Sequence, residues 1–236
     1  MYTTFSFALA VIPALFLVRY YYRQDSLKKE PKRLIVNVFL FGIISTVPVI
    51  IIELILTQFN KLLQEESLEF FAFKAFIVAG FSEELLKFLI VRYYVFKKAD
   101  FDEVMDGIVY AVVAGLGFAC LENIIYVVHG GISTAIIRAF TAIPLHALAA
   151  GIMGYYIGEA KFAQDSKIRN RLFLEGLLWA IIIHGLYDFL LFITPLAGFW
   201  ISLLTLPLLY AAYKILKRKI KRAKNEDLVM NRVTIS

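Results

Sequence analysis

The chain has 236 residues, of which 60% are hydrophobic and 19% are charged, and its mean hydropathy is +0.73. This composition excludes an ordinary soluble domain and is typical of a polytopic membrane protein. The single cysteine, Cys120, excludes an internal disulfide and a cysteine zinc cluster, so we expect it to pack in an apolar helix. The net charge of +6 comes mostly from basic residues between apolar segments, which indicates membrane orientation and not binding to nucleic acid.

Seven apolar segments are long enough to cross a bilayer as helices. Their approximate limits are 2–22, 34–57, 70–96, 106–128, 133–158, 171–193 and 197–216. None of them alternates strictly between apolar and polar residues, which a membrane-spanning strand would require. We therefore predict an all-α fold, a polytopic membrane bundle of about seven transmembrane helices that forms one domain over residues 1–236.

The basic residues between these segments predict how the chain lies in the membrane. Twenty of the 25 basic residues lie in segments 23–33, 92–105, 159–171 and 214–236. The alternate connections hold only Lys61. Because basic loops stay in the cytoplasm, we predict an N-terminus outside and a C-terminus in the cytoplasm, with the basic tail on anionic lipid. The acidic connection 58–69 is expected to form a short amphipathic helix on the outer surface.

Three charged residues interrupt the third apolar segment: Glu83, Glu84 and Lys87. Each such group costs about 2.5–3.5 kcal/mol at the centre of a span, so the three need a polar interior. On a helix, Glu83 and Lys87 share a face, whereas Glu84 points about 100° away. We therefore expect Lys87 to neutralise one carboxylate while the other faces a different group.

Further polar residues lie at a similar depth in other apolar segments, between the middle of the bilayer and its outer third. They are Glu122, His146, His184 and Asp188. A lone buried histidine is more often a structural group than a catalyst, but two histidines at the level of a glutamate pair indicate a site. Glu53 and Asp106 lie near the ends of their segments, where contact with water is sufficient to explain them.

Two local patterns add detail to this predicted site. His184 and Asp188 are four residues apart and share a helical face, so the aspartate can hold the histidine in one tautomer. Arg138 is a candidate counter-ion for Glu122 or Glu84.

Four sequence elements, in this order and each in its own predicted span, resemble the PrsW family of intramembrane proteases, within the wider group of CAAX prenyl endopeptidases. They are Glu83-Glu84-x-x-Lys87, Phe118-x-x-x-Glu122-Asn123, His146 and His184-x-x-x-Asp188. The CAAX branch typically has E-E-x-x-x-R and F-x-x-x-H. Here Lys87 stands one residue earlier and Glu122 replaces the histidine, which favours the PrsW branch.

The resemblance implies an intramembrane endopeptidase of a prokaryotic-type cell membrane, with a catalytic core at about 70–193. Its implied activity is site-1-type cleavage of single-pass membrane proteins in the lipid bilayer, with anti-sigma factors as the substrate class. Hydrolysis of an amide needs an activated water, a donor to the oxyanion and an acid for the leaving amine.

The implied roles follow the motif residues. Glu83 or Glu84 would be the general base, and His146 would orient the water or protonate the amine. His184, held by Asp188, would donate to the oxyanion. The supporting residues would be Lys87, Glu122, Asn123 and Arg138.

Two alternatives stay open at this point. Glu83, His146 and His184 form a two-histidine, one-carboxylate set of the kind that binds zinc, although no H-E-x-x-H motif is present. We favour a glutamate mechanism without a metal. A small proton-coupled transporter would also place glutamate, histidine and lysine at mid-membrane, but it predicts an inverted repeat that we do not find. A scaffold protein would need none of these buried polar groups.

Overall fold

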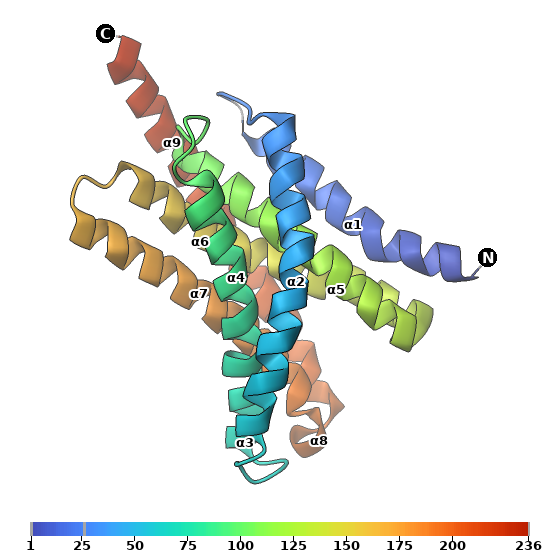
Figure 1. Cartoon of the computed structure of the whole chain (residues 1–236). Coiled ribbons are helices and arrows are strands. Elements are labelled where there is room, and N and C mark those ends of the chain that lie inside the picture. The colour runs from blue at the N-terminus through green and yellow to red at the C-terminus, as the bar shows by residue number, and fades with distance from the viewer. Residues whose placement is uncertain (1, 26, 236) are drawn as a thin grey trace.

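The computed structural model describes residues 2–25 and 27–235, and all regular structure in these ranges is helical (Figure 1). The elements in chain order are α1 (Tyr2–Gln24), α2 (Lys32–Asn60), α3 (Leu68–Phe73), η1 (Lys74–Phe81), α4 (Ser82–Leu89), η2 (Ile90–Val95), α5 (Val104–Phe140), α6 (Ala142–Phe162), α7 (Ser166–Phe192), α8 (Thr194–Ala197), η3 (Phe199–Leu204) and α9 (Thr205–Ile235). The predicted all-α class is therefore confirmed.

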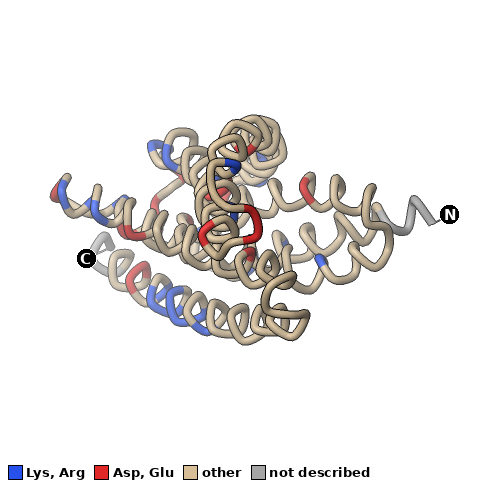
Figure 2. Tube along the Cα trace, turned by 90° about the horizontal axis from the view of Figure 1, so that it is seen from below, with Lys and Arg blue, Asp and Glu red and all other residues tan. Residues whose placement is uncertain are grey.

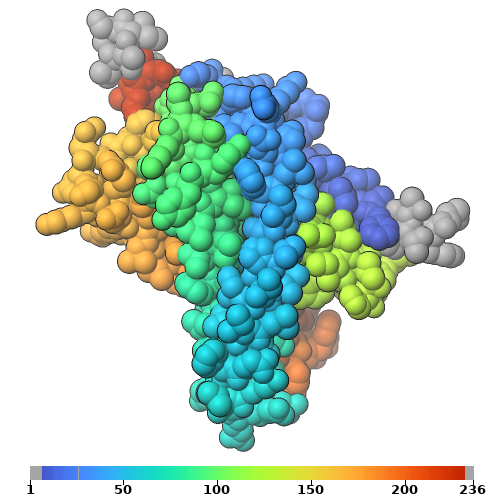
Figure 3. Space-filling model, viewed as in Figure 1, coloured from blue at the N-terminus to red at the C-terminus, as the bar shows by residue number. Residues whose placement is uncertain are grey.

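Four stretches of the described residues are long and apolar enough to cross a membrane: Lys32–Asn60, Val104–Phe162, Ser166–Phe192 and Phe199–Asn231. Large apolar side chains also point outward from α2, where Ile44 and Leu54 are 60% and 61% exposed. Figure 3 shows α2 along one face of the molecule, beside the run from α3 to η2. Such a face suits lipid as the surrounding solvent. The count of seven spans and their orientation stay predictions.

The centre of the bundle is α5, which packs tightly against α6. A Cβ added at Gly154 or Gly158 of α6 would collide with backbone carbonyl oxygens of Gly107 and Val104 on α5. Because only glycine permits this approach, the two backbones lie in direct contact. Cys120 is free and lies in the apolar core around this contact, as predicted from its sequence context.

The boundary between α5 and α6 differs from the predicted one. The predicted connection at 129–132 is only a break within α5, where Gly131 has φ 69° and ψ −159°, a conformation that favours glycine. Helical structure continues to Phe140, and the chain turns into α6 at Thr141. His146 therefore lies near the start of α6, and not deep inside a helix that begins at residue 133.

The run from α3 to η2 is one continuous helical rod beside α2 (Figure 1). Two of its parts, η1 and η2, are π-helices with wider turns, and they lie directly before and after α4. Such turns often mark functional sites because they re-aim the side chains of the neighbouring helix. Here the helix between them carries the three charged residues of the third apolar segment.

The prediction of an amphipathic helix at 58–69 is wrong. Helix α2 continues to Asn60, the next residues form turns, and α3 begins at Leu68. The Ser67 side chain accepts a hydrogen bond from the backbone N–H of Phe70 (3.1 Å), which fixes the start of α3. Ser67 lies inside the range 58–69, so the start of α3 falls where a single helix had been predicted.

The four basic segments meet at one end of the bundle, which we call the basic end. Lys28 pairs with Asp102, and Lys224 Nζ donates to Gln24 Oε1 (3.0 Å). Lys161 Nζ donates to two carbonyl oxygens of the connection before α5 (2.6 and 3.2 Å). Figure 2 shows Lys and Arg along much of α9. The predicted orientation requires this gathering on one side, and which side faces the cytoplasm stays a prediction.

Candidate active site

Four helices bring the polar residues of the predicted site together. Helix α4 supplies Glu83, Glu84 and Lys87, while α6 supplies His146 and α7 supplies His184. None of these five residues is more than 5% exposed. Helix α5 supplies the carboxylate of Glu122, which lies beside these five residues. We call the five buried residues the active-site cluster.

Lys87 lies at the centre of the active-site cluster. Its Nζ is 2.8 Å from Glu84 Oε1, 3.1 Å from Glu83 Oε2 and 3.0 Å from His146 Nδ1. It also lies 4.3 Å from the centre of the Phe118 ring, a favourable cation–π position. The expectation that Lys87 neutralises only one carboxylate is therefore wrong. Residues three and four positions before a lysine both lie within its reach on a helix.

The contacts of His146 define its tautomer. An ammonium group can only donate, so Nδ1 accepts from Lys87 and the ring proton is on Nε2. Nε2 then donates to Glu122 Oε2 (2.9 Å). Arg138 donates to the same oxygen of Glu122 (2.8 Å) and to Asn123 Oδ1 (2.8 Å). The counter-ion prediction for Arg138 is thus confirmed for Glu122, and the group holds His146 from the α5 side.

His184 lies between two carboxylates of α4 and one of its own helix. Its Nδ1 is 2.8 Å from Glu84 Oε1, and its Nε2 is 3.4 Å from Asp188 Oδ2 and 3.8 Å from Glu83 Oε2. Glu84, and not Asp188, is therefore the closest partner of His184. A pairing across 100 residues of sequence gives the ring its orientation.

A cavity of about 480 Å³ lies beside the active-site cluster, between α2, η1, α5 and α7. Glu83, Glu122 and Asp188 line this cavity, whereas Glu84 does not. Glu84 is fully buried, and its Oε2 has no hydrogen-bond partner in the part of the chain that the structure describes. Of the two adjacent glutamates, Glu83 is therefore the one that water and substrate can reach.

The cavity also contains a residue that sequence reasoning had set aside. Glu53 of α2 lines it, as does Lys74 of η1. The available signal was the otherwise apolar sequence around Glu53, from Ile50 to Ile55, which is unusual for a carboxylate at a solvated helix end. Nearness to a predicted span end does not show that a carboxylate is solvated.

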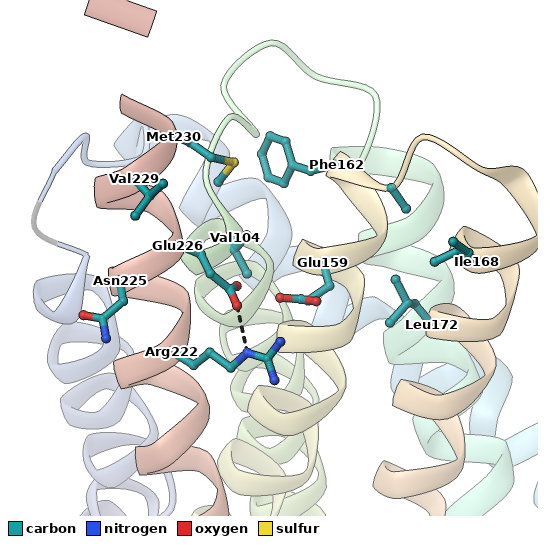
Figure 4. A pocket seen from close by; sticks show the side chains of 11 residues that line it. Val104, Glu159, Phe162, Ile168, Leu172, Arg222, Asn225, Glu226, Val229 and Met230 are labelled. Carbon is teal, nitrogen blue, oxygen red and sulfur yellow. Dashed lines mark hydrogen bonds and ion pairs between the residues drawn. The ribbon is translucent and has the colours of Figure 1, made fainter. Parts of the chain in front are cut away.

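A larger cavity lies far from this chemistry. It has a volume of about 650 Å³ and is formed by α6, α7 and α9 at the basic end (Figure 4). The Arg222 guanidinium pairs with Glu226 across one of its sides (2.8 Å), and apolar side chains cover most of the rest. No residue of the active-site cluster lines it, so size alone does not identify the active site.

The active-site cluster can hold a metal ion if Lys87 moves. One ligand atom from each of its glutamates and histidines lies within 4.8 Å of the others. Glu83 Oε2 is 3.8 Å from both His146 Nδ1 and His184 Nε2, and tetrahedral zinc ligands lie about 3.4 Å apart. Small shifts would thus complete a zinc site. However, Lys87 Nζ contacts two of these three atoms, so the ammonium and a metal ion would compete for the same position.

Comparison with known proteins gives the family. Residues 30–212 match the model of a family described as PrsW family intramembrane metalloprotease. The chain is 37% identical over 214 residues to Protease PrsW of Geobacillus kaustophilus. This alignment covers 91% of this chain and 90% of the relative. The chain is 35% identical over 219 residues to Protease PrsW of Bacillus subtilis, with 93% and 95% covered. No solved structure matches the chain. The chain therefore belongs to the PrsW family, and it is an intramembrane peptidase and an integral membrane protein.

Proposed function

We propose that this protease cuts single-pass membrane proteins near the outer end of their span, with a water molecule that Glu83 activates. The observation that carries the proposal is the unequal position of two adjacent glutamates. Glu83 lines the cavity, whereas Glu84 is sealed behind it with Lys87 and His184. A general base must reach the water whose proton it takes, and of these two glutamates Glu83 meets that condition.

The other residues act around Glu83. His184 Nδ1 is bound to Glu84, which leaves Nε2 on the side of Glu83 and Asp188, the two carboxylates that line the cavity. Nδ1 carries the proton that it donates to Glu84, so Nε2 can donate only when the ring holds a second proton, a state that the three neighbouring carboxylates favour. We assign to this protonated Nε2 the hydrogen bond to the oxyanion that forms when water attacks the amide carbon. Glu83 then returns the proton to the leaving amine, so one carboxyl group serves both steps.

His146 has a different role in this proposal from the one that the resemblance implied. Both of its ring nitrogens are engaged, with Lys87 and with Glu122. It therefore positions Lys87, and through Lys87 the carboxylate of Glu83, and does not meet the substrate itself. Arg138 supports this chain of contacts by holding Glu122.

A metal would change how the water is activated but not which residues surround it. Glu83, His146 and His184 would hold a zinc ion, which lowers the pKa of a bound water and polarises a carbonyl group. Elemental analysis of the purified protein distinguishes the two cases. One zinc per chain that is lost in His146→Ala would assign the three residues to the metal, and zinc-free active protein would assign water activation to Glu83 alone.

The place of cleavage follows from the direction in which the cavity lies. Thr57, Lys74 and Phe192 line it, and these residues lie toward the helix ends opposite the basic end. With the basic end in the cytoplasm, the cavity faces the outer half of the membrane. A substrate helix satisfies its own amides in lipid and must unwind before it is cut, which costs least at its membrane-exit segment.

This gives site-1-type cleavage that leaves a membrane-bound stub for a second protease. The class of substrate implied by the family resemblance is the anti-sigma factors. The test is reconstitution of the protein with a single-pass reporter in liposomes, followed by mass spectrometry of the retained fragment. We expect a new terminus at or just beyond the outer end of the reporter span. A terminus in the cytoplasmic half of the span would overturn the proposed site of cleavage.

A further inference from the structure

A second group of buried carboxylates lies at the basic end, away from the active-site cluster. Asp25 follows α1 and Glu30 precedes α2, while Glu103 caps α5, Asp106 lies in its first turn and Asp227 lies on α9. Each is less than 5% exposed, and Asp25 and Asp106 are fully buried. We call these five residues the carboxylate cluster. Nothing in the proposed peptidase chemistry uses them.

Some oxygens of the carboxylate cluster have structural partners. Asp106 Oδ2 accepts from the backbone N–H groups of Asp102 and Glu103 (2.9 and 2.7 Å). Asp227 accepts from the N–H groups of the first two residues of α5 (2.6 and 3.1 Å). These bonds satisfy donors that every helix leaves free at its N-terminus. They explain the burial of Asp227 and of one oxygen of Asp106, but not the burial of Asp25.

Asp25 has no such partner. Neither of its oxygens has a hydrogen-bond partner of normal geometry among residues 2–25 and 27–235. A side-chain hydrogen bond joins Glu30 and Asp106, and two carboxyl groups can form one only by sharing a proton. In the same residues, no lysine or arginine forms an ion pair with Asp25 or Asp106, and Lys28 pairs with the more exposed Asp102. Burying an unpaired carboxylate costs several kcal/mol, so something must compensate these groups.

The chemistry and the nearness of the oxygens indicate what compensates them. One carboxylate oxygen from each of Asp25, Glu103 and Asp106 lies within 4.8 Å of the other two. Carboxylate oxygens are ligands that hard divalent cations such as calcium and magnesium prefer. An all-oxygen, all-carboxylate set therefore suits a hard divalent cation.

We propose that Asp25, Glu103 and Asp106 bind a hard divalent cation, with Glu30 close to the site. The ligands come from the α1–α2 connection and from the start of α5, so the cation joins two segments that are distant in sequence. Asp227 already ties α9 to the same start of α5. The cation would thus clamp α1, α5 and α9 at the basic end.

The test measures terbium(III) luminescence in detergent-purified, chelator-treated protein. Tyr110 donates its hydroxyl to Glu30 and is placed to sensitise terbium at this site. Asp25→Asn is the decisive variant, because neither oxygen of Asp25 makes a bond that the substitution would remove. We expect it to weaken terbium binding about tenfold or more, since affinity follows the number of charged ligands. Calcium or magnesium should displace terbium, and the order of their displacement concentrations gives the preferred cation.

Two control variants exclude other origins of the signal. Glu83→Gln alters the active-site cluster, and Glu175→Gln removes an exposed carboxylate of α7 that pairs with Arg171. Both should bind terbium as the unmodified protein does. Loss of the signal in Glu83→Gln, or equal binding in Asp25→Asn, would overturn the proposal.

Thermal unfolding gives an independent reading. Calcium should raise the melting temperature of the unmodified protein but not of Asp25→Asn, and the chelated variant should melt no lower than the chelated parent. If Asp25→Asn does not fold, Glu103→Gln takes its place in both measurements. No effect of any cation, together with stability that falls as the pH rises through 6 to 7, would show that shared protons compensate the cluster and would contradict a cation site.

Discussion

The active-site cluster and the carboxylate cluster both bury several charged groups, but only the first compensates them from within. In the active-site cluster, Lys87 uses its donors on two carboxylates and a histidine, and among the described residues Glu84 Oε2 is the only fully buried side-chain oxygen of the cluster without a partner. In the carboxylate cluster, neither oxygen of Asp25 has a hydrogen-bond partner in the described part of the chain, and no ammonium group there forms an ion pair with it. A site whose charges are fixed by its own side chains is preorganised for a neutral substrate. A set of carboxylates without a positive group is suited to a cation.

The largest expected effect is the loss of activity in Glu83→Ala, compared with its neighbour Glu84→Ala. Removal of a general base costs about 10²–10⁴-fold, so cleavage of a reconstituted reporter should fall below detection while the protein still inserts into the membrane. Glu84→Ala should be nearly as damaging, because Glu84 orients both Lys87 and His184. His184→Ala should also abolish cleavage. Normal turnover by Glu83→Ala would contradict its role as the base.

The next effect tests how the active-site cluster is compensated. Lys87→Met leaves two carboxylates buried without a counter-ion, and breaking a buried ion pair costs about 3–5 kcal/mol. We expect a lower melting temperature and no cleavage. Adding Glu84→Gln to Lys87→Met should restore much of the stability without restoring activity. A melting temperature unchanged by Lys87→Met would mean that protons, and not the ammonium, compensate the glutamates.

A smaller effect is expected on the α5 side of His146. Glu122→Gln keeps one oxygen for Arg138 or His146 but removes the charge that both contact. Hydrogen bonds to charged groups contribute about 1.5–3 kcal/mol, so activity should fall about tenfold or more without disappearing. Glu175→Gln, an exposed position on α7, is the matched control and should retain full activity. Complete loss in Glu122→Gln would place Glu122 in the chemistry itself.

Contacts within one helix could be predicted from the sequence, but contacts between helices could not. Helical periodicity placed Lys87 beside Glu83 and His184 beside Asp188, and both pairs are present. The shortest contact of His184 is with Glu84, on a different helix. Such a pairing depends on how α4 and α7 pack, which no local pattern encodes. The shared depth of the polar residues indicated the cluster but not its internal partners.

Position along a span was a poor guide to burial. Asp106 lies near the predicted start of its span and was expected to contact water, yet it is fully buried. Residues distant in sequence cover it, among them the connection that holds Glu30 and the part of α9 that holds Asp227. The connection predicted at 129–132 likewise contains the break at Gly131, but the chain after it stays helical to Phe140. Long-range packing decided both cases.

The smallest expected effect concerns two cavity residues that, in the described part of the chain, form no hydrogen bond or ion pair with the active-site cluster. Glu53 and Lys74 line the cavity with opposite charges, on α2 and η1. In the proposed mechanism, a substrate segment that enters the cavity would pass between them before it reaches Glu83. Partly exposed charges of this kind contribute about 0.2–1 kcal/mol each, so each substitution should change kcat/KM about 1.5- to 5-fold. The effect should fall on KM and not on kcat, because neither residue touches the reacting atoms.

The two substitutions should act in opposite directions on charged substrates. Glu53→Gln should raise KM for a reporter with lysines at its outer juxtamembrane segment and lower it for one with aspartates. Lys74→Gln should do the reverse. Added salt should shrink both differences, since exposed charges are screened. The measurement is the ratio of KM values for the two reporters in each variant. Equal ratios in both variants and the unmodified protein would show that the substrate approaches Glu83 by a route other than this cavity.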